Sequence, residues 1–233
     1  HHVAEPRLPD AVAIVNPNRL DETSPVGQLC AAGMVFMLII AVNRALRDAF
    51  WYDEGHGEPN LINMLDLVAL ATVADVVPLT GVNRALVRQG LAVMSRRQNP
   101  GIAALADVSR LDQMPEAWHL GFMLGPRVNA GGRVGEAGLG VKLLTTTDVD
   151  EAAGIATRLD QYNSERREIE AAVLEAAMAQ AEQQAEADAP LIVAASEGWH
   201  PGVIGIVAGR IKEAFNRPAC VVSFENGVGK GSG

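Results

Sequence analysis

One proline-free stretch constrains the fold of this 233-residue chain more than any other feature. It runs from Asp148 to about Ala187 and consists mainly of Ala, Glu, Gln and Arg, most of which are strong helix formers. Asp148 followed by Glu151 resembles a capping box. A helix of this length would extend roughly 60 Å. A solvated helix or a coiled coil would fit the pattern. Because the sequence character changes sharply after it, we predict a connector helix between two domains.

The segment after the connector has the pattern of a strand-helix-strand unit. Leu191–Ala195 reads as a buried strand, Val203–Phe215 as a helix that Asn216 and Pro218 stop, and Ala219–Phe224 as a second buried strand. This order predicts a βαβ unit that begins an α/β domain. Gly227–Gly233 is a glycine-rich end with no closing element, as at a truncation or at the edge of an ordered region. The final GKGSG, taken alone, would fit a flexible turn.

The segment before the connector alternates apolar runs with glycine-rich or polar loops. The apolar fraction is 48 % and the aromatic fraction only 4 %, which favours close packing of helices on a sheet. The predicted elements are a strand at 11–15, helices at 24–50, 61–77 and 83–97, and glycine-rich loops at 125–133 and 135–140. The predicted fold class is α/β, with two α/β domains and a long connector helix. The predicted boundaries are 1–147, 148–188 and 189–233.

Charge and cysteine usage leave a nucleic-acid partner possible. The net charge is −9, but eleven acids and three arginines between Asp148 and Asp188 account for −8 of it. Cys30 and Cys220 are far apart in apolar surroundings, which predicts two reduced, buried thiols. The longest apolar run, Met34–Val42, is too short to span a bilayer, and no signal peptide is recognisable. The cytoplasm is therefore the expected compartment.

Two aspartates lie in the apolar segment 61–77. Asp75 is flanked by alanine and valines, where an unpaired carboxylate is costly, so a cation or a buried polar partner is expected. Asp66, nine residues earlier, falls on the opposite face of a continuous helix and is expected to be structural. The next helix carries Arg84, Arg88 and Arg96, which form either a solvated face or a DNA contact.

Two loops could hold an anion. Glycines around Arg127 and Arg133 would let the backbone approach a ligand whose phosphate oxygens the two guanidinium groups could bind. His200–Gly202 precedes a helix N-terminus, where backbone N–H groups favour negative charge.

Five stretches, spread over the chain in order, resemble the DHH phosphoesterases, and most closely the branch specific for single-stranded DNA. They are HHVAEPRLPDAVAIVNPNR, LDLVALATVADVVPL, GPRVNAGGR, SEGWHPGVIGIVAGRI and the final GKGSG. Two departures are Gly131, where many relatives have Ala, and the absence of the Asp expected before His1. Judged alone, His1-His2 would also fit a purification-tag remnant. The native-looking loop and strand that follow favour part of an Asp-His-His motif.

The resemblance implies a divided set of site residues. His1, His2 and Asp75 would bind metal, with His2 also able to face the substrate phosphate. Mn²⁺ or Mg²⁺ would be the cofactor, with two ions in the complete enzyme. The catalytic set would be His2, Asn129 and Arg133, and the substrate-binding set would be Arg127, His200, Gly202 and Ser232. The family's further carboxylate ligands lie before His1, so this fragment alone is expected to bind metal poorly and to be inactive.

The implied activity is 5′→3′ hydrolysis of single-stranded DNA in repair and recombination. The implied domains are the later part of a DHH domain and the start of a DHHA1 domain. Expected partners are single-stranded DNA, a single-stranded-DNA-binding protein and a recombination helicase, with no membrane. Trp199 is the one aromatic platform the sequence suggests for stacked bases, with a core position as the alternative. Alternatives for the whole are a phosphodiesterase of cyclic dinucleotides or short RNA, and an inactive structural part of replication machinery.

Overall fold

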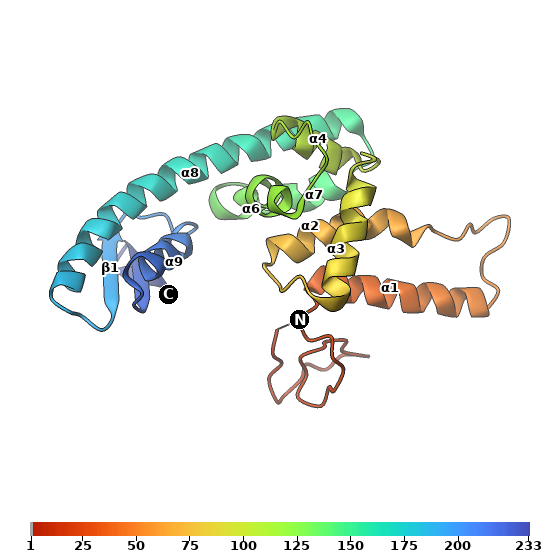
Figure 1. Ribbon diagram of the computed structural model, residues 1–233, viewed down its shortest axis with the longest axis horizontal. Helices are drawn as coiled ribbons and strands as arrows, with labels where there is room; N and C mark the ends of the chain where they lie inside the picture. Colours follow the sequence, from red (N-terminus) through yellow and green to blue (C-terminus); the bar gives the residue numbers. More distant parts are fainter. Residues whose placement is uncertain (1) are drawn as a thin grey trace. The chain divides into compact units, whose positions relative to one another are not determined.

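The chain forms two compact units, and residues 2–233 of the computed structural model are described. The first unit comprises His1–Pro126 and Leu143–Ala156, and the second comprises Arg127–Lys142 and Thr157–Gly233. The helix α8 (Val149–Glu186) contributes residues to both (Figure 1). Its presence confirms the predicted long helix. The boundaries at residues 147 and 188 remain a prediction.

The first unit is helical. Its elements are α1 (Ala31–Asp48), the 3₁₀ turn η1 (Leu61–Met64), α2 (Leu65–Ala74), α3 (Gly81–Met94), α4 (Pro100–Val108), α5 (Ala117–His119) and the π-helical turn η2 (Leu120–Leu124). Phe36 of α1, Val68 of α2 and Val93 of α3 meet in one buried cluster. A Cβ at Gly90 of α3 would lie 2.1 Å from the carbonyl oxygen of Leu65. Glycine at this position therefore lets α2 and α3 pack in direct contact.

Two sequence predictions in the first unit are wrong. Residues 11–15 form no strand, and Val12 and Val15 are exposed. A strand needs a neighbouring strand to pair with, and the described residues supply none for this segment. The first long helix begins at Ala31, not near Ser24, with the Cys30 sulfur accepting the N–H of Gly33 at 3.4 Å. The predicted loop at 51–60 and the helix at 61–77 are confirmed apart from their end residues.

The glycine-rich segment 125–133 is also not a loop. It forms the helix α6 (Gly125–Val134), and α7 (Leu139–Thr145) follows a short turn. α6 continues directly from η2, and the N–H of its first residue, Gly125, donates to the carbonyl of Leu120. Pro126 therefore follows immediately on the π-helical turn. A Cβ at Gly131 would lie 2.5 Å from the carbonyl oxygen of Glu136. Gly131 therefore serves close packing and not turn formation, which composition alone did not distinguish.

The second unit contains the predicted βαβ arrangement. Strand β1 (Ile192–Glu197) pairs in parallel with β2 (Ala219–Glu225), from Ile192 opposite Ala219 to Glu197 opposite Phe224. The helix α9 (Ile204–Phe215) connects them and ends at Asn216, which has φ 49°. Its buried residues pack with α8 and the sheet in one core that includes Val173, Ile192, Val207 and Ile211.

Residues 228–232 form a strand, which contradicts the flexible turn considered as the alternative for GKGSG. β3 (Val228–Ser232) pairs antiparallel with β2, with Ser232 opposite Val221. Asn226 and Gly227 connect the two strands with φ of 51° and 78°, as a two-residue hairpin turn requires. The sheet order is therefore β1-β2-β3, with β1 at one edge.

Two glutamines of α8 cover the edge of β1. The side chain of Gln180 accepts the N–H of Ala195 at 2.9 Å and donates to its carbonyl at 3.1 Å. Gln184 makes the same pair of bonds with Val193, at 2.9 Å and 2.8 Å. These four bonds satisfy backbone groups that an edge strand would otherwise leave open to another chain.

The expectations for the two cysteines and for membrane-spanning helices can be compared with the structure. Cys30 and Cys220 are free thiols, the first buried and the second half-buried. Among the helices that the structure describes, none has the combined length and apolar character that a membrane crossing demands.

Candidate functional site

Asp75 lies at the C-terminal end of α2, and its side chain is exposed. Its N–H donates to the carbonyl of Ala71 at 2.9 Å as the helix C-cap. The expectation of a buried carboxylate is therefore wrong, because α2 ends at Ala74 and the C-cap residue Asp75 is exposed. The following residue, Val76, has φ 56° and is 87 % exposed. A β-branched residue in the left-handed region costs on the order of 1–3 kcal/mol, which is typical of functional segments.

The metal site was predicted from His1, His2 and Asp75. His1 lies outside the described residues. His2 is exposed, and its backbone carbonyl accepts a hydrogen bond from the Asn16 amide at 2.9 Å. Imidazole and carboxylate are suitable donors for Mn²⁺. From His2 to the chain end, however, no group of three or more His, Cys, Asp or Glu side chains could hold an ion. Among the described residues, His2 and Asp75 therefore do not make a complete metal site by themselves.

Three of the predicted anion-binding residues meet in the second unit. Nη1 of Arg133, in the last turn of α6, donates to the carbonyl oxygen of Gly202 at 3.1 Å. The N–H of Gly202 donates to Nδ1 of His200 at 3.0 Å. Because Nδ1 accepts this bond, a neutral His200 ring carries its proton on Nε2. Residues 69 positions apart in sequence are thus joined just before the N-terminus of α9.

Ser232 lies at the same helix end. A Cβ built on Gly205, in the first turn of α9, would be 3.0 Å from the Ser232 hydroxyl. The first N–H groups of a helix have no partner within it and carry partial positive charge. Arg133, His200, Gly202 and Ser232 therefore surround a helix N-terminus within one unit. We call these four residues the α9 anion site.

Arg127 and Asn129 are not part of this group. Nε of Arg127 is 2.7 Å from Oδ1 of Asp160 in α8, so this guanidinium links α6 to α8. Asn129 is exposed on α6. The structure thus gives Arg127 a packing partner that its place in a glycine-rich segment did not suggest.

Trp199 belongs to the core and is not an exposed platform for bases. It is 9 % exposed and lies in the same buried cluster as Val203. Its backbone carbonyl accepts a hydrogen bond from the buried Ser223 hydroxyl of β2. This bond anchors the loop that carries His200 to the sheet, so Trp199 positions the site from within the core.

The remaining predicted contacts are spread over α3 and the turn after it. Arg84, Arg88 and Arg96 are all exposed. Asp66 is buried, and its Oδ1 accepts the N–H of Leu67 at 2.7 Å. Burial raises the pKa of the Asp66 carboxyl, while the bond from Leu67 opposes that rise. The burial of Asp66 and its bond to the neighbouring backbone agree with the structural role expected for this residue.

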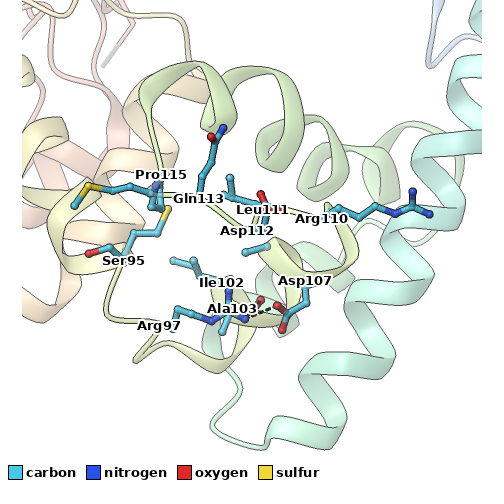
Figure 2. A pocket seen from close by; sticks show the side chains of 13 residues that line it. Ser95, Arg97, Ile102, Ala103, Asp107, Arg110, Leu111, Asp112, Gln113 and Pro115 are labelled. Atoms are coloured by element: carbon cyan, nitrogen blue, oxygen red, sulfur yellow. Dashed lines mark hydrogen bonds and ion pairs between the residues drawn. The ribbon is translucent and has the colours of Figure 1, made fainter.

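A cavity of about 520 Å³ in the first unit contains none of the predicted site residues (Figure 2). It has an apolar floor that includes Ile102 and Leu111, and a polar rim. On the rim, Arg97 Nη2 lies 2.5 Å from Asp107 Oδ1, and Figure 2 shows Arg110 extending away from this pair. The residues around it carry no arrangement that points to a reaction.

Sequence reasoning missed two carboxylates of α8 that form ion pairs within the second unit. Asp160 and Glu170 each pair with an arginine in the second unit. The spacing of Arg166 and Glu170, four residues apart on a helix, was a readable signal for one of these pairs.

No protein-family model matches the chain. The known proteins that it matches in sequence share one description. The chain is 45 % identical to the single-stranded-DNA-specific exonuclease RecJ of Dickeya dadantii and 43 % identical to that of Escherichia coli. Both alignments cover 100 % of this chain and 42 % of the relative. The chain thus spans less than half the length of these relatives.

Solved structures show the same relationship. RecJ from Thermus thermophilus in complex with Mn²⁺ matches with a TM-score of 0.72 and 36 % identity, over 84 % of this chain and 28 % of that one. A structure of exonuclease RecJ bound to manganese matches with a TM-score of 0.69 and 37 % identity, over 82 % of this chain and 46 % of that one. The chain is therefore related, along its entire length, to a segment of the single-stranded-DNA-specific exonuclease RecJ family.

Proposed function

We propose that this chain is the part of a metal-dependent exonuclease that grips the end of a single DNA strand and supplies some of its metal ligands. The proposed reaction is 5′→3′ hydrolysis of single-stranded DNA. The names of the relatives support this substrate over cyclic dinucleotides and over a purely structural role.

The observation that carries the proposal is the α9 anion site. A terminal phosphate there would face the first N–H groups of α9, the Ser232 hydroxyl and the guanidinium of Arg133. The bond from Arg133 to the Gly202 carbonyl, at 3.1 Å, uses one of the guanidinium's five donors. Its remaining donors can form charge-assisted bonds to phosphate oxygens. His200 would add a donor through Nε2.

The metal-binding role falls to His1, His2 and Asp75, with Mn²⁺ or Mg²⁺ as the ion. RecJ structures from Thermus thermophilus were solved in complex with each of these ions, which supports the choice. Bound cations would supply an activated water and neutralise charge at the scissile phosphate. Asn129, exposed on α6, is the further proposed catalytic residue, together with His2 and Arg133. Arg127 is a weaker candidate for substrate contact because Asp160 engages it.

The proposed domain assignment follows the same relationship. Residues 1–147 would belong to a DHH domain, 148–188 to the connector and 189–233 to the start of a DHHA1 domain. Roles in DNA repair and recombination, a cytoplasmic location, and contacts with a single-stranded-DNA-binding protein and a recombination helicase belong to the same proposal.

The test uses the full reading frame that encodes this chain, assayed on labelled single-stranded DNA with Mn²⁺. We expect release of nucleotides from the 5′ end, abolished by Asp75→Ala. Arg133→Ala should raise KM more for a 5′-phosphorylated strand than for a 5′-hydroxyl strand. Arg44→Ala, on the exposed surface of α1, serves as the matched arginine control.

Two results would contradict the proposal. One is activity confined to duplex DNA. The other is an Asp75→Ala protein that digests single strands as fast as the parent.

A further inference from the structure

Lys230 and Ser232 project from the same face of β3, because alternate residues of a strand lie on the same side of a sheet. The Ser232 hydroxyl identifies this face, since it lies 3.0 Å from the Cβ position of Gly205 in α9. On the opposite face, a Cβ at Gly229 would lie 2.9 Å from the Phe224 ring. Lys230 is therefore directed to the side of the sheet that α9 covers.

The strand register places Lys230 beside the loop that leads into α9. Its partner in β2 is Ser223, whose hydroxyl donates to the carbonyl oxygen of Trp199. Trp199 directly precedes His200 of the α9 anion site. Two residues of a strand span about 7 Å, so the backbone of Lys230 lies about 7 Å from that of Ser232. The flexible four-carbon side chain of lysine can bridge a separation of this size.

The ammonium group of Lys230 has no partner within residues 2–233. It forms neither a hydrogen bond nor an ion pair there, and the side chain is exposed. The acid at the end of β2, Glu225, pairs in register with Val228, two residues from Lys230. In the part of the chain that the structure describes, this carboxylate forms no ion pair with the lysine. The Lys230 charge is thus available to a ligand.

Protection of the sheet edge is the other role open to this lysine. β3 is an edge strand, and a charged side chain on an edge hinders pairing with another chain. Edge protection works with charge of either sign, whereas binding of a phosphate needs a positive charge. Lys230→Glu therefore separates the two roles, because it keeps a charge on the edge and reverses its sign.

A terminal phosphate has more negative charge than the four residues of the α9 anion site neutralise. A phosphate monoester carries about −1.5 to −2 at pH 7, whereas each internal phosphodiester carries about −1. Arg133 is the one permanent cation among the four residues. The start of a helix contributes the equivalent of roughly +0.5. A second cation is therefore needed to match a doubly charged strand end.

We propose that Lys230 is this second cation and that the α9 anion site thereby selects a terminal phosphate monoester over a phosphodiester. This inference rests on the proposed function and names the form of strand end that the site recognises. Arg133 comes from α6 and Lys230 from β3, so two cations face a doubly charged phosphate. The neutral donors of His200, Ser232 and the first turn of α9 fix its orientation.

The test measures binding of three dT oligonucleotides to the 233-residue chain, each with a fluorescent label at its 3′ end. Their 5′ ends are a phosphate, a methyl phosphate ester that keeps one charge, and a hydroxyl. At about pH 8 the 5′-phosphate is doubly charged, since its second pKa is about 6. Lys230→Gln removes the cation. Lys212→Gln is the matched control, because it removes one exposed lysine charge about 12 Å along α9 from its start.

The parent should bind the 5′-phosphate roughly tenfold more tightly than the methyl ester, the contribution of one charge-assisted hydrogen bond. Lys230→Gln should lose most of this difference, and Lys212→Gln should keep it. Lys230→Arg should restore the difference, because it retains the charge. Lys230→Glu should abolish it, and light scattering should show no added aggregation of this variant. Thermal unfolding checks that each variant remains folded.

The outcomes separate the role of Lys230 from the proposed function. If Lys230→Gln keeps the preference for the phosphate over its methyl ester while Arg133→Ala still weakens binding, the inference is wrong and the proposed function stands. Equal weakening of all three oligonucleotides by Lys230→Gln would assign this lysine to internal phosphates and also contradict the inference. If the parent does not distinguish the 5′-phosphate from the 5′-hydroxyl and Arg133→Ala changes nothing, both are wrong.

Discussion

Gly202 lies directly against the backbone of Arg133, and the two residues are also joined by a hydrogen bond. A Cβ at Gly202 would lie 2.2 Å from the Arg133 carbonyl oxygen, and Arg133 Nη1 donates to the Gly202 carbonyl at 3.1 Å. The close approach fixes where the end of α6 meets the loop before α9. The guanidinium of Arg133 is thereby positioned by backbone contact. At position 202, no residue other than glycine fits without a shift of the backbone.

Gly202→Ala should therefore destabilise the second unit and displace Arg133. Overpacking of this kind costs about 1–3 kcal/mol, since the contacted atoms are backbone atoms that cannot rotate away. Denaturant unfolding would measure the loss. The matched control is Gly209→Ala in α9, where an added Cβ meets nothing within 4 Å. It should stabilise the chain by up to about 1 kcal/mol through helix propensity. Equal effects of the two substitutions would contradict the contact.

Arg127 and Asp160 should be coupled in stability, since their ion pair links α6 to α8. The Nε–Oδ1 distance is 2.7 Å, and the side chains are 17 % and 36 % exposed. A double-mutant cycle with alanine should give a coupling of roughly 0.5–3 kcal/mol. The exposed pair Arg158 and Glu136, 3.8 Å apart, should give about 0–1 kcal/mol. A smaller coupling for Arg127 and Asp160 than for this control would show that the pair does not hold the two helices together.

Gln180 and Gln184 should protect the edge of β1. Gln180→Ala/Gln184→Ala leaves four backbone groups of Val193 and Ala195 without their side-chain partners. Losing such partners costs roughly 1–3 kcal/mol when the groups are poorly hydrated, and the opened edge can pair with another chain. We expect a lower unfolding temperature and faster aggregation by light scattering. Gln183→Ala, an exposed neighbour on α8, should change neither.

Asp66 should make stability depend on pH. Burial raises the pKa of its carboxyl in the folded chain above the unfolded value, so the ionised form is disfavoured by folding. The parent should therefore lose stability as pH rises from the unfolded pKa through the folded pKa. Asp66→Asn lacks this charge, and its amide oxygen can still accept the Leu67 N–H. The stability difference in favour of Asp66→Asn should grow from about pH 3 to pH 7. A difference that stays constant over this range would refute the prediction, and exposed Asp112→Asn is the control.

Local sequence patterns predicted residues 192–225 of the second unit well. β1, α9 and β2 were predicted because strand and helix periods are local and their partners lie within the same segment. The strand predicted at residues 11–15 was wrong because pairing is not local. The loop predicted at 125–133 was wrong because close packing of α6 demands glycine as much as a turn does.

The sequence also predicted only part of the candidate site. Motif resemblance selected Arg133, His200, Gly202 and Ser232, and the structure brings these four together. No sequence pattern indicated that Arg133 bonds to the Gly202 backbone, because that contact depends on how α6 packs. The local argument for Asp75 was wrong for a similar reason, since apolar neighbours in sequence do not ensure burial at a helix end.

Gly205→Ala should weaken recognition of a terminal phosphate without harming the fold. An added Cβ would lie 3.0 Å from the Ser232 hydroxyl, and this flexible side chain can move aside. Alanine also favours the helix by up to about 1 kcal/mol, so the unfolding temperature should hold or rise. The displaced hydroxyl would no longer lie at the start of α9. Affinity for a 5′-phosphorylated single strand should then fall by roughly three- to tenfold, the loss of about one hydrogen bond. Affinity for a 5′-hydroxyl strand should change little, and Gly209→Ala should affect neither. If Gly205→Ala weakens both strands equally, the Ser232 hydroxyl does not contact the terminal phosphate.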